Sequence, residues 1–241
     1  MTQPQFETTY APAYRRPLVA PRTGVMAPTR EGGRRALNVL LAGAGLVLAA
    51  PLMVAIAALI KLTSRGPVVY TQSRVGLDRR NGGRARPVSR RADDCGGRPF
   101  QIFKFRTMRH NGGNDDAQVW ANPDDPRVTP LGRVLRQYRL DELPQLFNVL
   151  LGDMNMVGPR PEQPQIFRRL RARIEGYHHR QRVRPGITGW AQINHHYDRS
   201  VDDVRRKVAL DLEYVVRQSA WEDLRILLRT VPVVAFRRGA W

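Results

Sequence analysis

The feature that most constrains this chain is a long segment without charge near its start. From Ala36 to Ile60 the sequence ALNVLLAGAGLVLAAPLMVAIAALI runs for 25 residues with no charged side chain. As a straight helix it would extend about 37 Å at ~1.5 Å per residue, enough for the hydrocarbon core of a bilayer. A cleaved signal peptide is the alternative, but the polar stretch before the segment is too long and apolar sequence continues past any alanine-rich cleavage site. We therefore predict a membrane-associated protein.

The topology of this segment has two possible forms. Pro51 lies at its centre, where it removes one helical hydrogen bond and favours a kink. Basic residues flank both ends, Arg34 and Arg35 before it and Lys61 and Arg65 after it, so the positive-inside rule assigns no orientation. A segment that enters the membrane, breaks at Pro51 and returns to the same face explains both observations. A spanning helix with an incidental proline explains only the first, and both forms stay open at this point.

Length and charge limit the rest of the chain to one domain with a basic surface. The 241 residues can bury one substantial core. The 40 Lys and Arg against 21 Asp and Glu give a net charge of +19, which favours an anionic partner: nucleic acid, acidic lipid headgroups or a phosphorylated substrate. The preference for arginine suits bidentate phosphate binding, although a GC-rich genome produces the same bias. The single Cys95 excludes an internal disulfide and a cysteine-based zinc site, which fits the cytoplasm.

The composition also suggests where the chain divides. Residues 1–33 are rich in proline and show no apolar period, which indicates a disordered basic tail. The membrane segment then occupies residues 34–64, a cytoplasmic domain residues 65–236 and a short tail residues 237–241. Within the domain, residues 77–98 are rich in glycine and arginine, which is typical of a mobile, solvated insertion.

Local patterns predict a small hairpin followed mainly by helices, an α/β fold. Residues 67–76 and 99–108 are rich in β-branched and aromatic residues and are predicted strands. A helix should begin after Thr129, and its arginines, Arg133, Arg136 and Arg139, lie on one face that either meets the membrane interface or points to water. Residues 201–217 read as a further helix, and Ser219 with Glu222 forms a capping box before the next one.

Two adjacent carboxylates are unexpected in so basic a chain. Asp141 and Glu142 begin the stretch DELPQLFNVLLG, in which Pro144 is tolerated only in the first turn of a helix. We therefore expect a helix from about Asp141 to Gly152, with one apolar stripe formed by Leu143, Leu146, Phe147 and Leu150. Its N-terminus would favour an ionised aspartate and phosphate oxygens. Asp141 as a simple N-cap is the alternative, but that role leaves Glu142 unexplained.

Cationic residues flank this pair in the sequence on both sides. Arg160 lies between Pro159 and Pro161, which limit the backbone freedom lost when its guanidinium grips a phosphate. Upstream, Lys104 and Arg106 alternate along the second predicted strand and should face the same side.

A glycine-rich turn lies downstream in RVRPGITGWAQIN. Here Gly186 and Gly189 follow Arg184, and glycines in a turn admit a ligand closely. Cations around an acidic pair suggest phosphoryl chemistry, with Asp141 as nucleophile and Mg²⁺ held between carboxylate and phosphates.

Together these motifs resemble one family. KFRTM, LDELPQLFNVLLGDMNMVGPRPE and RVRPGITGWAQIN, in that order after one proline-interrupted apolar segment, resemble the bacterial polyprenyl-phosphate sugar-1-phosphate transferases. These are the monotopic phosphoglycosyl transferases of exopolysaccharide and glycan assembly, and the resemblance covers residues 36–235 apart from the Arg-rich insertion. It implies a re-entrant helix hairpin broken at Pro51, with both ends on the cytoplasmic face of the inner membrane.

The resemblance also implies a ping-pong reaction and assigns roles. Asp141 would attack the β-phosphate of a UDP-sugar and release UMP, and undecaprenyl phosphate would then remove the phosphosugar. Glu142, with Asp141, would hold Mg²⁺. The phosphate- or nucleotide-binding residues would be Lys104, Arg106, Pro159, Arg160, Pro161 and Arg184. The expected sugar is a neutral hexose. Membrane lipids are expected to surround the protein, and a homodimer is a possible assembly.

Some features depart from the family or favour another class of protein. Residues 77–98 replace a short turn, and His195 with His196 stands where many members have glycine, a difference that affects either sugar selectivity or only the surface. No histidine has the spacing of a zinc site, so no zinc is expected.

The alternative function is a membrane-tethered basic module that binds nucleic acid or anionic lipid without catalysis. It leaves Asp141 and Glu142 unexplained, since carboxylates weaken binding to a polyanion, and we expect no nucleic acid.

Overall fold

The computed structural model describes residues 31–78, 97–109, 125–195 and 201–235. Most of the predicted N-terminal tail, most of the predicted insertion with Cys95, and the C-terminal tail lie outside these ranges. The described part is mostly helical with two small sheets, which confirms the predicted α/β class.

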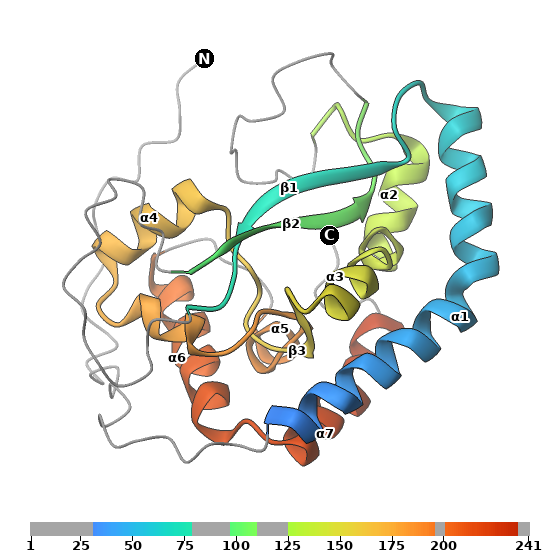
Figure 1. The fold of residues 1–241 in the computed structure, drawn as a ribbon. Helices are drawn as coiled ribbons and strands as arrows, with labels where there is room; N and C mark the ends of the chain where they lie inside the picture. The colour runs from blue at the N-terminus through green and yellow to red at the C-terminus, as the bar shows by residue number, and fades with distance from the viewer. Residues whose placement is uncertain (1–30, 79–96, 110–124, 196–200, 236–241) are drawn as a thin grey trace, which may run out of the picture.

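The apolar segment forms one long helix, α1 (Glu31–Thr63), which begins inside the predicted tail. The helix continues through Pro51 and is bent about halfway along its length (Figure 1). The predicted break is therefore a bend, because proline removes one hydrogen bond while the neighbouring turns keep theirs. Within the described ranges, α1 is the one helix long and apolar enough to cross a membrane. Only 11% of its most apolar window is buried, unlike the core helix of a soluble protein.

The start of α1 is fixed to the C-terminal helices and to a short strand. The guanidinium of Arg34 binds the carboxylate of Asp223 at 2.9 Å and donates to the hydroxyl of Tyr214 at 2.8 Å. One helical turn later, the Oδ1 of the buried Asn38 accepts a hydrogen bond from the backbone N–H of Met156 at 2.6 Å. These contacts hold the beginning of α1 against the folded body.

The end of α1 is fixed to the same body. Arg106 donates to the carbonyl oxygens of Ser64 at 2.8 Å and Arg65 at 2.7 Å, just past the last helical residue. Ile56 and Ile60 are buried in one cluster with side chains of the hairpin and of the helix α2 (Pro130–Gln137). Both ends of α1 therefore contact one folded domain.

The predicted hairpin is confirmed. Strands β1 (Val69–Val75) and β2 (Pro99–Phe105) pair antiparallel, with Tyr70 opposite Lys104. Helices α4 (Pro164–Arg173) and α6 (Val201–Arg217) pack on one side of the hairpin, and α3 (Gln145–Leu151) with α1 on the other (Figure 1). The core is therefore divided between the two sides of the hairpin.

A second, parallel sheet was not predicted. Strands β3 (Asn155–Val157) and β4 (Gly186–Thr188) lie so close that a Cβ on Gly186 would meet the Gly158 nitrogen at 2.0 Å. A Cβ on Gly189 would meet the Gly158 oxygen at 2.2 Å. The glycines that we expected to admit a ligand instead let two backbones approach, and the N–H of Gly186 donates to the Pro159 carbonyl at 3.1 Å.

Several helix ends confirm the sequence patterns. Helix α2 (Pro130–Gln137) begins after Thr129, whose hydroxyl accepts from the N–H of Gly132, and α6 has the predicted bounds. Helix α7 (Ala220–Ala235) begins with Ser219 accepting from the N–H of Glu222 at 3.1 Å. The remaining helical elements are α5 (Trp190–Asn194) and the 3₁₀ turns η2 (Leu140–Glu142) and η3 (Tyr177–Arg182).

The helix that we expected from Asp141 begins later, at Gln145. Pro144 cannot donate a hydrogen bond, and the N–H of Leu143 and of Leu146 each reach back three residues, as in a 3₁₀ helix. Asp141 and Glu142 therefore lie in η2, ahead of α3 rather than in its first turn. Of the predicted apolar stripe, Leu146 is buried, whereas Phe147 and Leu150 are exposed.

Candidate active site

The two adjacent carboxylates are both buried, with 7% of each residue exposed. They follow Arg139, which has a φ of 57° and is the one residue other than glycine with a positive φ in the described ranges. A left-handed conformation costs a residue with a side chain roughly 1–2 kcal/mol. This turn leads the chain directly from α2 into η2 and places the Arg139 guanidinium 3.8 Å from Glu142.

Glu142 is surrounded by cations. Its Oε1 accepts hydrogen bonds from Lys104 Nζ and from Arg160 Nη2, each at 2.9 Å. Burial alone would raise the pKa of Glu142, but the charges of Arg160, Lys104 and Arg139 hold this pKa well below its usual range. Glu142 is therefore ionised at neutral pH and serves as the shared anion of the cationic side chains.

Asp141 has a different environment. Its Oδ2 lies 3.9 Å from Lys104 Nζ, and it accepts no hydrogen bond from any residue in the described part of the chain. Burial raises the pKa of Asp141 above its usual range, the neighbouring Glu142 raises it further, and Lys104 opposes both. Two adjacent carboxylates thus have opposite pKa shifts, which is the arrangement expected when one is a structural anion and the other reacts.

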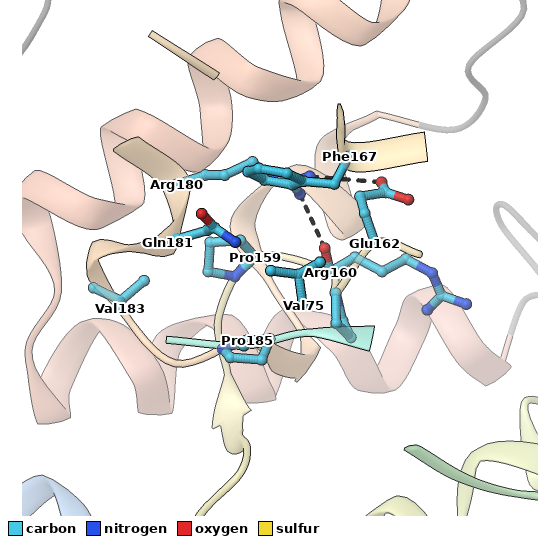
Figure 2. Close-up of a pocket in the computed structure, with 11 residues that line it drawn as sticks. Val75, Pro159, Arg160, Glu162, Phe167, Arg180, Gln181, Val183 and Pro185 are labelled. Atoms are coloured by element: carbon cyan, nitrogen blue, oxygen red, sulfur yellow. Dashed lines mark hydrogen bonds and ion pairs between the residues drawn. The ribbon is translucent and has the colours of Figure 1, made fainter. Parts of the chain in front are cut away.

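Arg160 reaches Glu142 from a rigid turn. Pro159 and Pro161 flank it, as the sequence indicated, and its Nη1 also donates to Gln192 Oε1 at 3.3 Å. Figure 2 shows the Arg160 guanidinium extending away from Arg180, while the Arg160 carbonyl accepts a hydrogen bond from Arg180 at 3.0 Å. The backbone and the side chain of Arg160 are thus bound on opposite sides.

A buried network of ion pairs supports this turn. Arg180 binds Asp211 at 2.6 Å and Glu162 at 3.5 Å, and Glu162 also binds Lys207 at 3.0 Å. Burial works against the charge of Glu162, but Lys207, Arg180 and Arg74 lower its pKa to about 2. The network links the turn to α6 and η3, so the position of Arg160 depends on buried charges that do not touch the carboxylate pair.

Two predicted phosphate-binding residues lie elsewhere. Arg106 follows the last residue of β2, so the strand alternation that would have placed it beside Lys104 stops before it, and its guanidinium binds Ser64 and Arg65 instead. Arg184 Nε donates to the Gly152 carbonyl at 3.1 Å, at the opposite end of α3 from Asp141. The structure therefore brings Lys104, Asp141, Glu142 and Arg160 together, but not Arg106 or Arg184.

Sequence reasoning missed three residues of this site. Arg139 and Gln192 contact Glu142 and Arg160, and the charge of Arg136 acts on Asp141. The three-residue spacing of Arg133, Arg136 and Arg139 was visible, but it indicated a helix face rather than a site. His195 follows the last residue of α5, and His196 lies outside the described residues.

The pair alone does not form a complete metal site. In the described ranges, no three or more His, Cys, Asp or Glu side chains lie together so that they could hold a metal ion. Mg²⁺ is commonly bound by one or two carboxylates plus substrate phosphates. Asp141 and Glu142 fit that donor set, because no residue in the described ranges donates a hydrogen bond to the oxygens of Asp141.

Comparison with known proteins identifies the family of the chain. The family described as bacterial sugar transferase matches residues 29–237. The UDP-N-acetylgalactosamine-undecaprenyl-phosphate N-acetylgalactosaminephosphotransferase of Aeromonas hydrophila is 42% identical over 207 residues, 86% of this chain and 44% of that protein. The UDP-glucose:undecaprenyl-phosphate glucose-1-phosphate transferase of Escherichia coli K12 is 40% identical over 200 residues, 82% of this chain and 39% of that protein.

A third relative matches along nearly its whole length. The exopolysaccharide production protein ExoY of Rhizobium meliloti is 34% identical over 238 residues, 93% of this chain and 95% of that protein. The chain spans less than half the length of the first two relatives. These matches show that the chain belongs to the bacterial sugar transferase family.

The network behind Arg160 predicts a pH-dependent stability. Because the folded-state pKa of Glu162 is lowered to about 2, its ionised form stabilises the protein above the unfolded pKa, and this contribution is lost as the pH falls from about 4.5 towards 2. At neutral pH the Glu162→Gln variant should unfold at a lower temperature than the unmodified protein. Its free energy of unfolding should be lower by roughly 3 kcal/mol at most. The two melting temperatures, measured in detergent, should converge near pH 2. A constant difference across this range would contradict the ion-pair role.

Proposed function

We propose that this bacterial sugar transferase moves a sugar 1-phosphate from a UDP-sugar to undecaprenyl phosphate and thereby initiates exopolysaccharide or glycan synthesis. The observation that carries the proposal is the contrast between Asp141, which has no hydrogen-bond donor in the described ranges, and Glu142, which is bound by Lys104 and Arg160. The names of the relatives support the substrate classes, because two of them act on undecaprenyl phosphate with a UDP-sugar.

In the first step, an oxygen of Asp141 attacks the β-phosphorus of the UDP-sugar. The bond from that phosphorus to the oxygen bridging the two phosphates breaks, and UMP leaves with the bonding electron pair. The raised pKa of Asp141 makes its carboxylate more basic than that of an exposed aspartate, which favours attack. Lys104 and Arg160 lie where they can neutralise charge on the phosphoryl oxygens.

In the second step, a phosphate oxygen of the polyprenyl phosphate attacks the same phosphorus. The bond between phosphorus and the Asp141 oxygen breaks, and the carboxylate recovers its electron pair. The product is polyprenyl diphosphate carrying the sugar, and the enzyme returns to its starting state. One carboxylate serves both steps, so UMP leaves before the lipid reacts.

Mg²⁺ completes the proposed site. When bound, it would shield the negative charge of the diphosphate, and Asp141 with Glu142 supplies the carboxylates that would hold it. The remaining ligands would come from phosphate oxygens and water. The chain itself contributes the orientation of both carboxylates, through η2 and the cations on Glu142.

The attachment of α1 supports a re-entrant membrane helix. A straight helix of 33 residues would extend about 50 Å and place its ends on opposite sides of a bilayer. Both ends of α1 contact the same domain, through Arg34 and Asn38 at the start and Ser64 and Arg65 at the end. We therefore propose that α1 enters the inner membrane and returns at its bend, with the domain on the cytoplasmic face.

The reaction is tested by replacing Asp141. With Mg²⁺, undecaprenyl phosphate and a panel of UDP-sugars, the purified protein should release UMP, and Asp141→Asn should lower the rate by on the order of 10³-fold or more, since the nucleophile is lost. Asp202→Asn, which removes an exposed aspartate of α6, is the matched control and should keep the activity. The UDP derivative of a neutral hexose should be the best donor.

The same preparation distinguishes the alternative function. Salt-sensitive binding to DNA or acidic vesicles that Asp141→Asn leaves unchanged, without UMP release from any UDP-sugar, would support the non-catalytic basic module instead.

The metal proposal predicts that Mg²⁺ binds well only with the donor. Because two carboxylates are an incomplete ligand set, Mg²⁺ alone should leave the melting temperature unchanged, whereas Mg²⁺ with the UDP-sugar should raise it. Chelation with EDTA should stop UMP release, and Glu142→Gln should raise the Mg²⁺ concentration needed for activity. Full activity after chelation would exclude this role.

The topology is tested with single cysteines at Gly33 and Lys61, in a background where Cys95 is replaced by serine. Both positions flank the apolar part of α1 and are exposed. An impermeant maleimide should label both in inside-out vesicles and neither in intact spheroplasts. Labelling of one of them from the periplasmic side would show a spanning helix.

A further inference from the structure

A cationic pocket separate from the candidate active site lies at the opposite end of α3 from the carboxylate pair. It has an empty volume of about 380 Å³, is open to solvent, and is lined chiefly by Arg34, Arg35, Asn155, Arg182, Arg184 and Gln218. The seven residues of α3 separate it from η2 by about 10 Å at ~1.5 Å per residue. We propose that this pocket binds the phosphate of an anionic membrane phospholipid, outside the site that carries the reaction.

Three of its arginines have guanidinium nitrogens that nothing in the described chain uses. Arg35 donates through Nη2 to the Leu150 carbonyl at 3.0 Å, while its buried Nη1 has no hydrogen-bond partner. Arg184 donates only through Nε, and the side chain of Arg182 makes no hydrogen bond or ion pair within the described ranges. No described carboxylate pairs with any of the three, so an anion would supply the missing acceptors.

The neutral groups of the pocket fit the same ligand. Asn155 is 6% exposed and lines the pocket, and its Oδ1 has no partner. An amide exchanges its oxygen and nitrogen by a 180° rotation, so the side chain can present its NH₂ to an anion. Arg34, by contrast, is already bound to Asp223 and Tyr214 and forms a fixed wall of the pocket. A buried polar group without a partner costs stability, and a phosphate bound to Asn155 would remove that cost.

The surroundings of the pocket favour a lipid over free phosphate. Arg35 lies at the start of α1, and the apolar Val39 and Leu40 follow it, with 70% of Leu40 exposed. On the neighbouring helix, 68% of Leu151 is exposed beside the Leu150 carbonyl that Arg35 binds. Cations bordered by exposed apolar side chains are typical of a surface at the headgroup level of a membrane. A headgroup there would fix the depth at which α1 leaves the domain.

Lipid-dependent stability of the full chain tests the proposal. In neutral detergent micelles, phosphatidylglycerol should raise the melting temperature by several degrees relative to phosphatidylcholine. The double variant Arg182→Gln/Arg184→Gln should lose at least half of that rise. Arg169→Gln/Arg173→Gln, which removes the same charge from exposed positions of α4, should keep it.

Further arms separate the outcomes. An equal loss in both double variants, or no loss in either, would overturn the site, because binding would then follow net charge alone or other residues. The single variant Arg182→Gln guards against misfolding, since that side chain makes no hydrogen bond or ion pair in the described part of the chain, and it should lose part of the rise. Stabilisation by inorganic phosphate equal to that by phosphatidylglycerol would identify a free anion as the ligand. Stabilisation by undecaprenyl phosphate alone would assign the pocket to the acceptor; either result would overturn the proposal.

Discussion

The site depends on one carboxylate that joins three separate parts of the chain. Glu142 in η2 accepts hydrogen bonds from Lys104 of β2 and from Arg160 of the turn after β3, each at 2.9 Å. Removing one partner from a buried ion pair costs roughly 3–5 kcal/mol, because the other charge is left without compensation. The three cations around Glu142 are thus held close to Asp141, yet none of them forms a short ion pair with Asp141 itself. That separation leaves Asp141 available for the proposed attack, in a strongly basic site.

Rigidity is provided by groups that substrate would not touch. Arg180, Asp211, Glu162 and Lys207 fix the backbone of the turn that carries Arg160. The glycine contact between β3 and β4 holds the same turn from the other side, through the hydrogen bond from Gly186 to Pro159. A guanidinium held in this way would lose little conformational entropy on binding the phosphate proposed for it. The left-handed backbone of Arg139 is a local strain of the kind that clusters at functional sites.

Features set by local chemistry were predictable from the sequence. The hairpin and the caps at Thr129 and Ser219 follow from alternation and capping. The grouping of Lys104 and Arg160 with the carboxylate pair was predicted from the chemistry of these residues and from the family resemblance. What failed depended on contacts between distant segments. Arg106 was assigned to the site because strand alternation was extended past the point where β2 ends. The role of the glycines required knowledge of a parallel strand pair, which no local pattern indicated.

Helix α1 is part of the support of the site as well as the proposed membrane anchor. The residues on either side of the carboxylate pair, Leu140 and Leu143, pack against the cluster that contains Ile56 and Ile60 of α1. Further along, Gly45 of α1 lies against Leu146 of α3. A Cβ added to Gly45 would be 3.4 Å from a methyl group of Leu146. The site therefore lies beside α1, which is where the phosphate of the proposed lipid substrate would arrive if α1 enters the bilayer as proposed.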